Sequence, residues 1–410
     1  MSIAKKSKWP EKRLPEDYYF CQKEKRMNYQ GNLKSKLPNT EQSIFAVMSK
    51  MANEHGAINL SQGFPDFQIS NELIDRVHHY MKSGNNQYAP MPGIAALREA
   101  ISKKVERDHG VYYNPETKIN ITAGATQALY TAISAFVRDD DEVIIFEPAY
   151  DSYAPAVKVN GGHVKYAQME MPDYTINWKH LAKMITNRTK MIIINTPHNP
   201  TGSVLSENDL LQLQHITNKS DIIVLSDEVY EHLIFDGLQH HSVCRFPDLA
   251  DRSLAVGSFG KTFHATGWKV GYVLAPENLM REFRKVHQWV VFAVNTPIQM
   301  AITDFLQNDG NYRNLPEFFQ QKRNKFLELI KTSRFKPIPC SGTYFQCLDY
   351  SAIADESDLD FSRRLTIDHK IASIPLSPFF MNGRDDKILR FCFAKKDETL
   401  QQAAEILCKI

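Results

Sequence analysis

The sequence predicts an α/β protein with a large domain built on a mainly parallel sheet covered by helices, and a second, smaller α+β domain. Between residues 118 and 275, short apolar runs alternate with stretches of helix length, as in parallel sheets covered on both faces. After residue 297 the pattern changes to longer helical periods and a few further strands. The 410 residues, 43% of them hydrophobic, suffice for two domains.

Seven apolar runs are the expected strands of the large sheet, at residues 119–123, 142–146, 164–167, 191–195, 222–226, 254–257 and 272–275. Sheets of this kind bind ligands at the carboxyl ends of their strands. Gly124, Asn195, Asp227 and Ser258 fall at such ends, so we expect the functional site there. The sequence has no G-x-G-x-x-G pattern, which leaves a dinucleotide site without support.

The small domain is expected to combine segments from both ends of the chain. Helical periods of apolar residues cover 42–54 and 312–332, and strands are expected around 342–348, 372–375 and 387–393. We expect residues 42–70 and 298–410 to form the small domain, 71–297 the large domain, and 1–41 an N-terminal arm or extension.

The first 36 residues differ in composition from the rest. They mix basic with acidic side chains and are broken by two prolines, which favours a flexible arm. The alternative is an arm that wraps a partner subunit through its aromatic side chains, which are Trp9, Tyr18, Tyr19 and Phe20.

Composition and charge exclude several classes of protein. The net charge of +2 gives no case for nucleic acid or a membrane surface as a main partner, and no apolar run approaches the length of a membrane span. The six cysteines contain no C-x-x-C pair, which suits free thiols in a reducing cytosol better than disulfides or a zinc site. We therefore expect a cytoplasmic protein without a metal centre.

Lys261 needs an explanation because it lies in a glycine-containing segment between two apolar runs. It is either a solvated loop lysine, the end of a phosphate-binding G-K-T loop, or a lysine that carries pyridoxal phosphate covalently. The second interpretation fails because the leading glycine of that loop would be residue 255, which is Ala255, and no helical pattern follows Thr262.

The third interpretation requires a buried carboxylate beside the ring nitrogen of pyridoxal phosphate, and donors for its phenolic oxygen. Asp227, at the end of an apolar strand, meets the first requirement. Tyr230 and Asn199 meet the second, since a phenol and an amide both supply N–H or O–H donors.

A phosphate site requires free backbone amides at the start of a helix. The segment from Gly124 through Ala125 and Thr126 follows the pattern of strand, turn and helix. Ser258 and Lys269, on either side of Lys261, add a hydroxyl and a charge for the same phosphate.

Taken together, the spacing of Asn199-Pro200, Asp227-x-x-Tyr230, Ser258-x-x-Lys261 and Lys269 resembles the class I, fold-type I aminotransferases, which depend on pyridoxal phosphate. The segments N-L-S-Q-G-F-P-D-F at 59–67, N-Q-Y at 86–88, T-G-W-K-V-G at 266–271 and G-T-Y-F at 342–345 resemble the kynurenine and methionine aminotransferase branch, and within it the bacterial methionine aminotransferases. The resemblance spans residues 37–410. It implies a homodimer, with active sites shared across the interface, that transfers an amino group from an amino acid to a 2-oxo acid by a ping-pong mechanism.

The resemblance also implies roles for residues that the pattern alone does not assign. Tyr150 matches the ring that stacks on the cofactor, and Tyr88 the tyrosine that reaches the phosphate of the other subunit. Gly63 and Phe64 match the loop beside the substrate. Arg390, an arginine between apolar residues on a strand, needs an anion, and the resemblance favours the substrate carboxylate over a structural salt bridge.

Other polar residues near these motifs receive no catalytic role. Tyr153 is expected only to pack in the core, and His198 and His264 are as compatible with structural hydrogen bonds as with proton transfer. Lys269 stands where many class members carry arginine, and kynurenine-type relatives carry lysine there.

Substrate choice is predicted from one further segment. Relatives that act on acidic substrates use a second arginine from the neighbouring subunit, but the comparable residues 287–294 contain none, and Phe292 is the candidate substrate contact among them. An apolar or aromatic amino acid is expected: methionine first, then phenylalanine, tyrosine, tryptophan, kynurenine, histidine or glutamine.

Two other functions stay open. One is a cysteine-conjugate β-lyase that uses the same cofactor, and the other is a non-catalytic binding protein that kept the aminotransferase fold. The intact set of Lys261, Asp227, Tyr230, Asn199 and Arg390 argues against the second, because a binding protein has no need of a reactive lysine.

Overall fold

The computed structural model describes residues 29–410, of which residues 39–410 form one compact unit. The preceding segment 29–38 contains neither helix nor strand. The predictions made for residues 1–28, including the anchors Trp9, Tyr18, Tyr19 and Phe20, lie outside the described residues.

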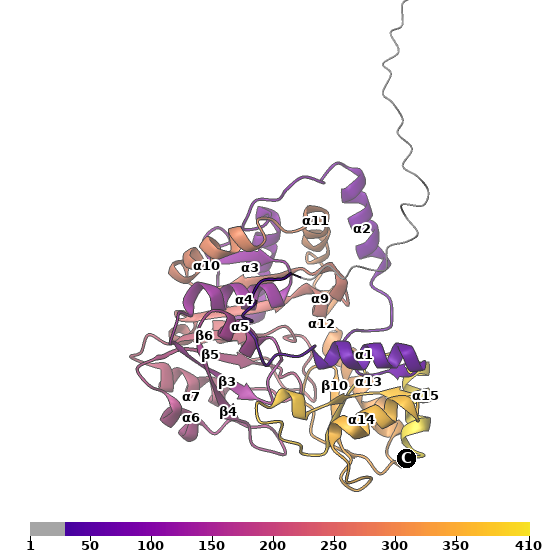
Figure 1. Ribbon diagram of the computed structural model, residues 1–410. Coiled ribbons are helices and arrows are strands. Elements are labelled where there is room, and N and C mark those ends of the chain that lie inside the picture. The colour runs from indigo at the N-terminus through magenta and orange to yellow at the C-terminus, as the bar shows by residue number, and fades with distance from the viewer. Residues whose placement is uncertain (1–28) are drawn as a thin grey trace, which may run out of the picture. The chain divides into compact units, whose positions relative to one another are not determined.

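The centre of the compact unit is a seven-stranded sheet with the order β2-β8-β7-β6-β5-β3-β4 (Figure 1). Its strands are β2 (Ile119–Thr122), β3 (Glu142–Glu147), β4 (His163–Gln168), β5 (Thr189–Asn195), β6 (Ile223–Asp227), β7 (Ser253–Ser258) and β8 (Gly271–Leu274). All pairs are parallel except those of β8, which is antiparallel to both neighbours. The seven predicted strands and the mainly parallel sheet are confirmed.

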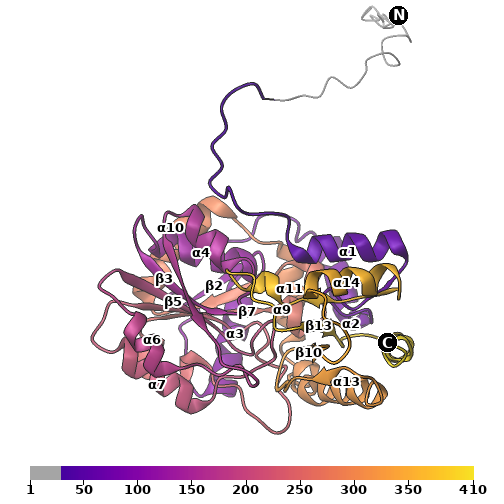
Figure 2. The same cartoon turned by 60° about the horizontal axis from the view of Figure 1, so that its bottom comes forward.

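Helices cover both faces of this sheet because alternate strand residues point to opposite sides. Val143 and Ile145 of β3 pack in one core with α4 (Ala125–Phe136), α5 (Tyr153–Val159) and α10 (Glu277–Val290). Ile144 and Phe146 pack in the other core, which also takes in α3 (Ala95–His109), α6 (Trp178–Met184) and α7 (Glu207–Thr217). Figure 2 shows α4 and α10 on one side of the sheet and α6 and α7 on the other. Strands buried on both faces account for the continuous apolar runs in the sequence.

Segments from both ends of the described chain meet in the remaining part. A four-stranded antiparallel sheet has the order β12-β13-β10-β9. Its strands are β9 (Lys336–Pro337), β10 (Phe345–Asp349), β12 (Ile374–Pro375) and β13 (Ile388–Cys392). A parallel pair, β1 (Ile58–Asn59) with β11 (Ile371–Ala372), joins the segment after α1 (Ile44–His55) to it, and α1 lies beside α14 (Asp358–Ile367) in both views.

One predicted helix is divided in two. The period over 312–332 corresponds to α12 (Gly310–Arg313) and α13 (Leu315–Leu329), with Asn314 between them. Pro316 lies in the first turn of α13, where its missing N–H costs nothing, so a new helix starts there. The other α-helices are α2 (Asn71–Lys82), α8 (Pro247–Ala250), α9 (Phe259–Thr262), α11 (Thr296–Phe305) and α15 (Asp397–Leu407). Within residues 29–410, none of the helices is long and apolar enough to cross a membrane.

Candidate active site

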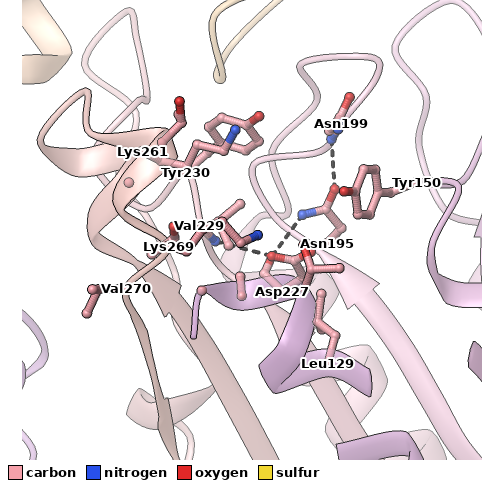
Figure 3. Close-up of a pocket in the computed structure, with 16 residues that line it drawn as sticks. Leu129, Tyr150, Asn195, Asn199, Asp227, Val229, Tyr230, Lys261, Lys269 and Val270 are labelled. Atoms are coloured by element: carbon pink, nitrogen blue, oxygen red, sulfur yellow. Dashed lines mark hydrogen bonds between the residues drawn. The ribbon is translucent and has the colours of Figure 1, made fainter. Parts of the chain in front are cut away.

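A cavity of about 210 Å³ opens where β5, β6 and β7 end and α4 begins (Figure 3). Apart from Tyr88, every residue predicted to hold the cofactor lines it: Ala125, Thr126, Tyr150, Asn199, Asp227, Tyr230, Ser258, Lys261 and Lys269. The cavity therefore lies at the carboxyl ends of the parallel strands, where the sequence predicts the functional site.

Asp227 is a buried carboxylate without an ion-pair partner in the described chain. It ends β6, and its Oδ2 accepts a hydrogen bond of 2.7 Å from the hydroxyl of Tyr153. Burial raises the pKa of Asp227 to about 6, although the Tyr153 hydroxyl and the Val229 N–H oppose that rise. A buried carboxylate in this condition is suited to a cationic group on a ligand.

Two asparagines fix the backbone around Asp227. The side chain of Asn195 donates to the carbonyl of Asp227 at 2.9 Å and accepts the N–H of Asn199 at 2.8 Å. Figure 3 shows this chain of hydrogen bonds from Asn199 through Asn195 to Asp227. The segments at the ends of β5 and β6 are thereby held together at one edge of the sheet.

Lys261 is a partly buried lysine without a carboxylate partner in the described residues. It lies in the short helix α9, and its Nζ donates to the hydroxyl of Tyr344 at 3.0 Å. Burial lowers the pKa of Lys261 to about 8. Near neutral pH a substantial fraction of this amine is unprotonated, which makes it both a nucleophile and a base.

The start of α4 forms an anion cradle. Gly124 has φ +79°, and a Cβ at this position would lie 3.3 Å from the Nζ of Lys269. The helix has no side-chain cap, so the first amides, including those of Ala125 and Thr126, point into the cavity region without an intrahelical partner. Twelve residues of helix and a lysine at its N-terminus suit a phosphate group.

Arg390 lies in β13 with its whole side chain buried. Its Nη1 donates to Oδ1 of Asn199 at 2.7 Å and its Nη2 to the carbonyl of Ser61 at 3.0 Å, whereas its Nε has no partner. The guanidinium stacks on the ring of Phe345 at 3.8 Å and forms no ion pair among residues 29–410. An arginine in this condition lacks the anion that its charge requires.

Comparison with known proteins agrees with this geometry. The family model described as aminotransferase class I and II matches residues 55–407. The chain belongs to this aminotransferase family. It is 48% identical over 374 residues to the methionine aminotransferase of Escherichia coli strain K12, covering 91% of this chain and 97% of the relative.

Further relatives confirm the branch and the fold of this aminotransferase. It is 33% identical over 408 residues to a kynurenine–oxoglutarate transaminase of Dictyostelium discoideum, covering 90% of this chain and 94% of that one. The crystal structure of YbdL from Escherichia coli, which has a methionine aminotransferase function, matches with a TM-score of 0.90 at 47% identity, covering 92% of this chain and 100% of the other. The fold is that of the fold-type I pyridoxal phosphate enzymes.

The aminotransferase depends on pyridoxal phosphate, as its family does, and the cavity fits that cofactor. Asp227 is a buried acid without a cation, which suits the protonated ring nitrogen. The start of α4 with Lys269 suits the phosphate, and the amine of Lys261 lines the same space.

Four further residues predicted for the site of the aminotransferase, Gly63, Phe64, Tyr88 and Phe292, are not among those that line the cavity. The carbonyl of Gly63 accepts the hydroxyl of Tyr344 at 2.6 Å, and the carbonyl of Phe64 accepts Nζ of Lys395 at 2.9 Å. Tyr88 and Phe292 do not line this cavity. They are 83% and 57% exposed, and their rings pack edge to face at 5.2 Å.

Sequence reasoning missed two residues of the site. The expectation that Tyr153 only packs in the core is wrong, because its hydroxyl binds Asp227. Tyr344 was noticed only as part of the G-T-Y-F segment, although it contacts Lys261. The available signals were a second tyrosine in the segment of Tyr150 and a tyrosine directly before a predicted strand.

Proposed function

We propose that this aminotransferase takes the amino group from an apolar or aromatic amino acid, methionine above all, and passes it to a 2-oxo acid by a ping-pong mechanism. The observation that carries the proposal is that Lys261, an amine of lowered pKa, and Asp227, a buried acid without an ion-pair partner in the described residues, line one cavity. The 48% identity to a methionine aminotransferase supports methionine as the donor.

The proposed cofactor contacts follow from the cavity lining. When bound, pyridoxal phosphate supplies an electron sink for the pair of electrons left when the substrate α-carbon loses its proton. Asp227 would keep the ring nitrogen protonated, and Tyr230 and Asn199 would donate to the phenolic oxygen. The amides of Ala125 and Thr126, together with Ser258 and Lys269, would hold the phosphate, and Tyr150 would pack against the ring.

Lys261 has two proposed tasks. Its Nζ would hold the cofactor covalently in the resting enzyme, since an unprotonated amine is a nucleophile. As a general base and then a general acid, Nζ would also carry the proton that leaves the substrate α-carbon. Its lowered pKa of about 8 supports both tasks, because a larger fraction of the amine is unprotonated near neutral pH than in an ordinary lysine.

Arg390 is the residue proposed to bind the substrate α-carboxylate. Its unpartnered Nε and its lack of an acidic partner in the described chain support this role. Asn199, which already contacts Arg390, assists it, and the loop of Gly63 and Phe64 lies beside the substrate. Residues 287–294 contain no arginine, which supports a substrate with an apolar side chain.

The proposed enzyme is a homodimer with shared sites. Tyr88 and Phe292 are large exposed side chains that lie away from the cavity of their own chain, which supports a role for Tyr88 at the phosphate and Phe292 at the substrate of a second copy. Residues 42–70 and 298–410 form the proposed small domain and 71–297 the large one. The described cysteines are free thiols, which supports a cytoplasmic location.

The test is an absorbance spectrum of the purified protein before and after addition of methionine. A visible cofactor band that converts to the pyridoxamine form, and that is absent from Lys261→Ala, supports the proposal. Lys285→Ala, at an exposed lysine of α10, is the matched control and should behave as wild type. No cofactor band even with pyridoxal phosphate supplied would refute the enzyme, and a band indifferent to apolar and aromatic amino acids would refute the substrate class.

The rival β-lyase activity has its own readout. Pyruvate released from a cysteine conjugate without any 2-oxo acid acceptor would show elimination in place of amino transfer. We expect pyruvate release from the cysteine conjugate to be slower than the conversion of the cofactor band by methionine.

A further inference from the structure

Tyr344 connects Lys261 to the loop of Gly63, and the proposed mechanism leaves it without a task. It precedes β10, and its side chain is completely buried. Its hydroxyl lies 2.6 Å from the carbonyl oxygen of Gly63 and 3.0 Å from Nζ of Lys261. The ring packs edge to face against Tyr230 at 5.2 Å, so this tyrosine borders the cavity without being one of its lining residues.

The direction of both hydrogen bonds is determined by chemistry. A carbonyl oxygen only accepts, so the single hydroxyl hydrogen of Tyr344 goes to Gly63. The phenolic oxygen is then left as an acceptor for an N–H of Lys261. A neutral amine that donates one hydrogen to Tyr344 and another, at 3.5 Å, to the carbonyl of Gly63 has its lone pair turned away from both acceptors. Burial raises the pKa of Tyr344 well above its ordinary value, so the phenol keeps its hydrogen at all working pH values.

The loop that contains Gly63, the acceptor of Tyr344, is held in place by further hydrogen bonds. The carbonyl of Ser61 accepts Arg390, and that of Phe64 accepts Lys395 at 2.9 Å. The carboxylate of Asp66 accepts the hydroxyl of Thr399 at 2.8 Å. A side chain held by a rigid acceptor can orient its other partner closely, which an isolated hydroxyl in a mobile loop cannot do.

We propose that Tyr344 is a positioning residue: its hydroxyl orients the amine of Lys261 for proton transfer at the substrate α-carbon and ties that orientation to the loop beside the substrate. The inference rests on the proposed function of Lys261 as the proton carrier. It assigns the tyrosine no proton transfer of its own.

The first test uses the holoenzyme and single-turnover conversion with methionine and with α-deuterated methionine. Tyr344→Phe removes only the hydroxyl. We expect its rate constant for conversion to fall roughly 10- to 100-fold with a larger isotope effect, because a misdirected base slows the proton transfer, while cofactor affinity stays the same. Tyr350→Phe is the matched control, since Tyr350 is also fully buried and donates to a carbonyl, that of Glu356 at 3.0 Å, away from the site.

The second test needs no substrate. Competitive acetylation of Lys261 in the cofactor-free full-length chain, followed by mass spectrometry across pH, gives the midpoint of its ionisation. Loss of an acceptor that also stabilises the ammonium form should move the midpoint down in Tyr344→Phe and leave it unchanged in Tyr350→Phe.

The outcomes separate this inference from the proposed function. Wild type that fails to convert any amino acid refutes the proposed function. Wild type that converts methionine, with a Tyr344→Phe variant equal to it in isotope effect and midpoint, or no worse than Tyr350→Phe, refutes the role of Tyr344. If Tyr344→Phe does not fold, 3,5-difluorotyrosine introduced at position 344 keeps the hydroxyl but weakens it as an acceptor, and an unchanged isotope effect there refutes the inference equally.

Discussion

The end of β6 carries two kinds of buried carboxylate on opposite sides of the backbone. Asp227 lines the cavity and forms no ion pair within residues 29–410, and burial raises its pKa to about 6. Glu231 faces α3, where it binds Nζ of Lys104 at 2.7 Å and the hydroxyl of Tyr272 at 2.6 Å. Despite its burial, the pKa of Glu231 is lowered, with Lys104 as the main cause.

Glu228 is, like Glu231, a buried carboxylate that already has a partner, since its Oε2 lies 2.9 Å from Nε2 of His240. Asp227, which has no ion-pair partner in the described residues, is therefore directly followed by one paired acid, Glu228, and lies four positions before another, Glu231. A paired buried charge belongs to the stability of the fold, and an unpaired one marks the position of a missing ligand charge. Substitutions on the two sides should accordingly have opposite consequences.

Asp227→Asn should give the largest loss of activity. An amide cannot keep the ring nitrogen of the cofactor charged, so kcat/KM with methionine should fall about 1000-fold or more. Stopped-flow or steady-state rates of the purified variant measure this. A variant within tenfold of wild type would remove Asp227 from the proposed role.

The same variant should be more stable than wild type when both lack cofactor. The pKa of Asp227 in the fold, about 6, lies above its unfolded value of 3.8, so this acid contributes most stability when it is protonated. That contribution declines as pH rises from about 4 to 6 and stays low above pH 6. The free energies of unfolding, measured by denaturant titration, should therefore be equal below pH 4 and favour Asp227→Asn by up to about 3 kcal/mol above pH 6.

Glu231→Gln should have the reverse effect. Lys104 is 2% exposed and would keep only Asp108, at 3.2 Å, as its anion. Removing one member of a buried pair should lower the free energy of unfolding by about 3 kcal/mol, while the rate per folded molecule stays close to wild type. Thermal melting and active-site titration measure the two quantities. A Glu231→Gln variant that is stable but inactive would show that Glu231 also takes part in the reaction.

The smallest expected effect compares two arginines in the same way. Arg390 has no acidic partner in the described chain, whereas Arg323 holds Asp236 through two hydrogen bonds of 2.6 Å. Arg390→Lys should raise KM for methionine roughly 10- to 100-fold because lysine lacks the planar fork. Arg323→Lys should leave KM unchanged and cost about 1 kcal/mol of stability, since its pair is partly exposed. Equal KM values for the two variants would count against a carboxylate seat at Arg390.

Much of the fold was predictable because it depends on local patterns. The strands of the large sheet are buried on both faces, so each is a continuous apolar run that can be read without knowing its neighbours. The interruption between α12 and α13 was missed because the apolar period continues through Asn314, although Pro316 favours a new start. The short β9 and β1 carried no pattern long enough to detect.

The candidate site was predictable where chemistry is tied to residue type. A lysine, an acid, an asparagine and a tyrosine at strand ends can be recognised singly, and they do line one cavity. Tyr153 and Tyr344 could not be assigned in this way, because a buried tyrosine is an ordinary core residue until its hydroxyl has a partner. The exposure of Tyr88 and Phe292 could not be predicted from the sequence, because it depends on which parts of the folded chain cover them.

The sequence alone determined which chemical groups this aminotransferase possesses and the order along the chain of the strands that carry them. Only the tertiary structure decided which of its charges are paired, because pairing depends on distances between remote segments. Lys104 and Glu231 are 127 residues apart, Arg390 and Asn199 191, and Tyr344 and Gly63 281. Electrostatic and hydrogen-bond energies fall off within a few ångströms, so whether Asp227 is left unpaired and Glu231 satisfied depends on packing, which no local pattern records.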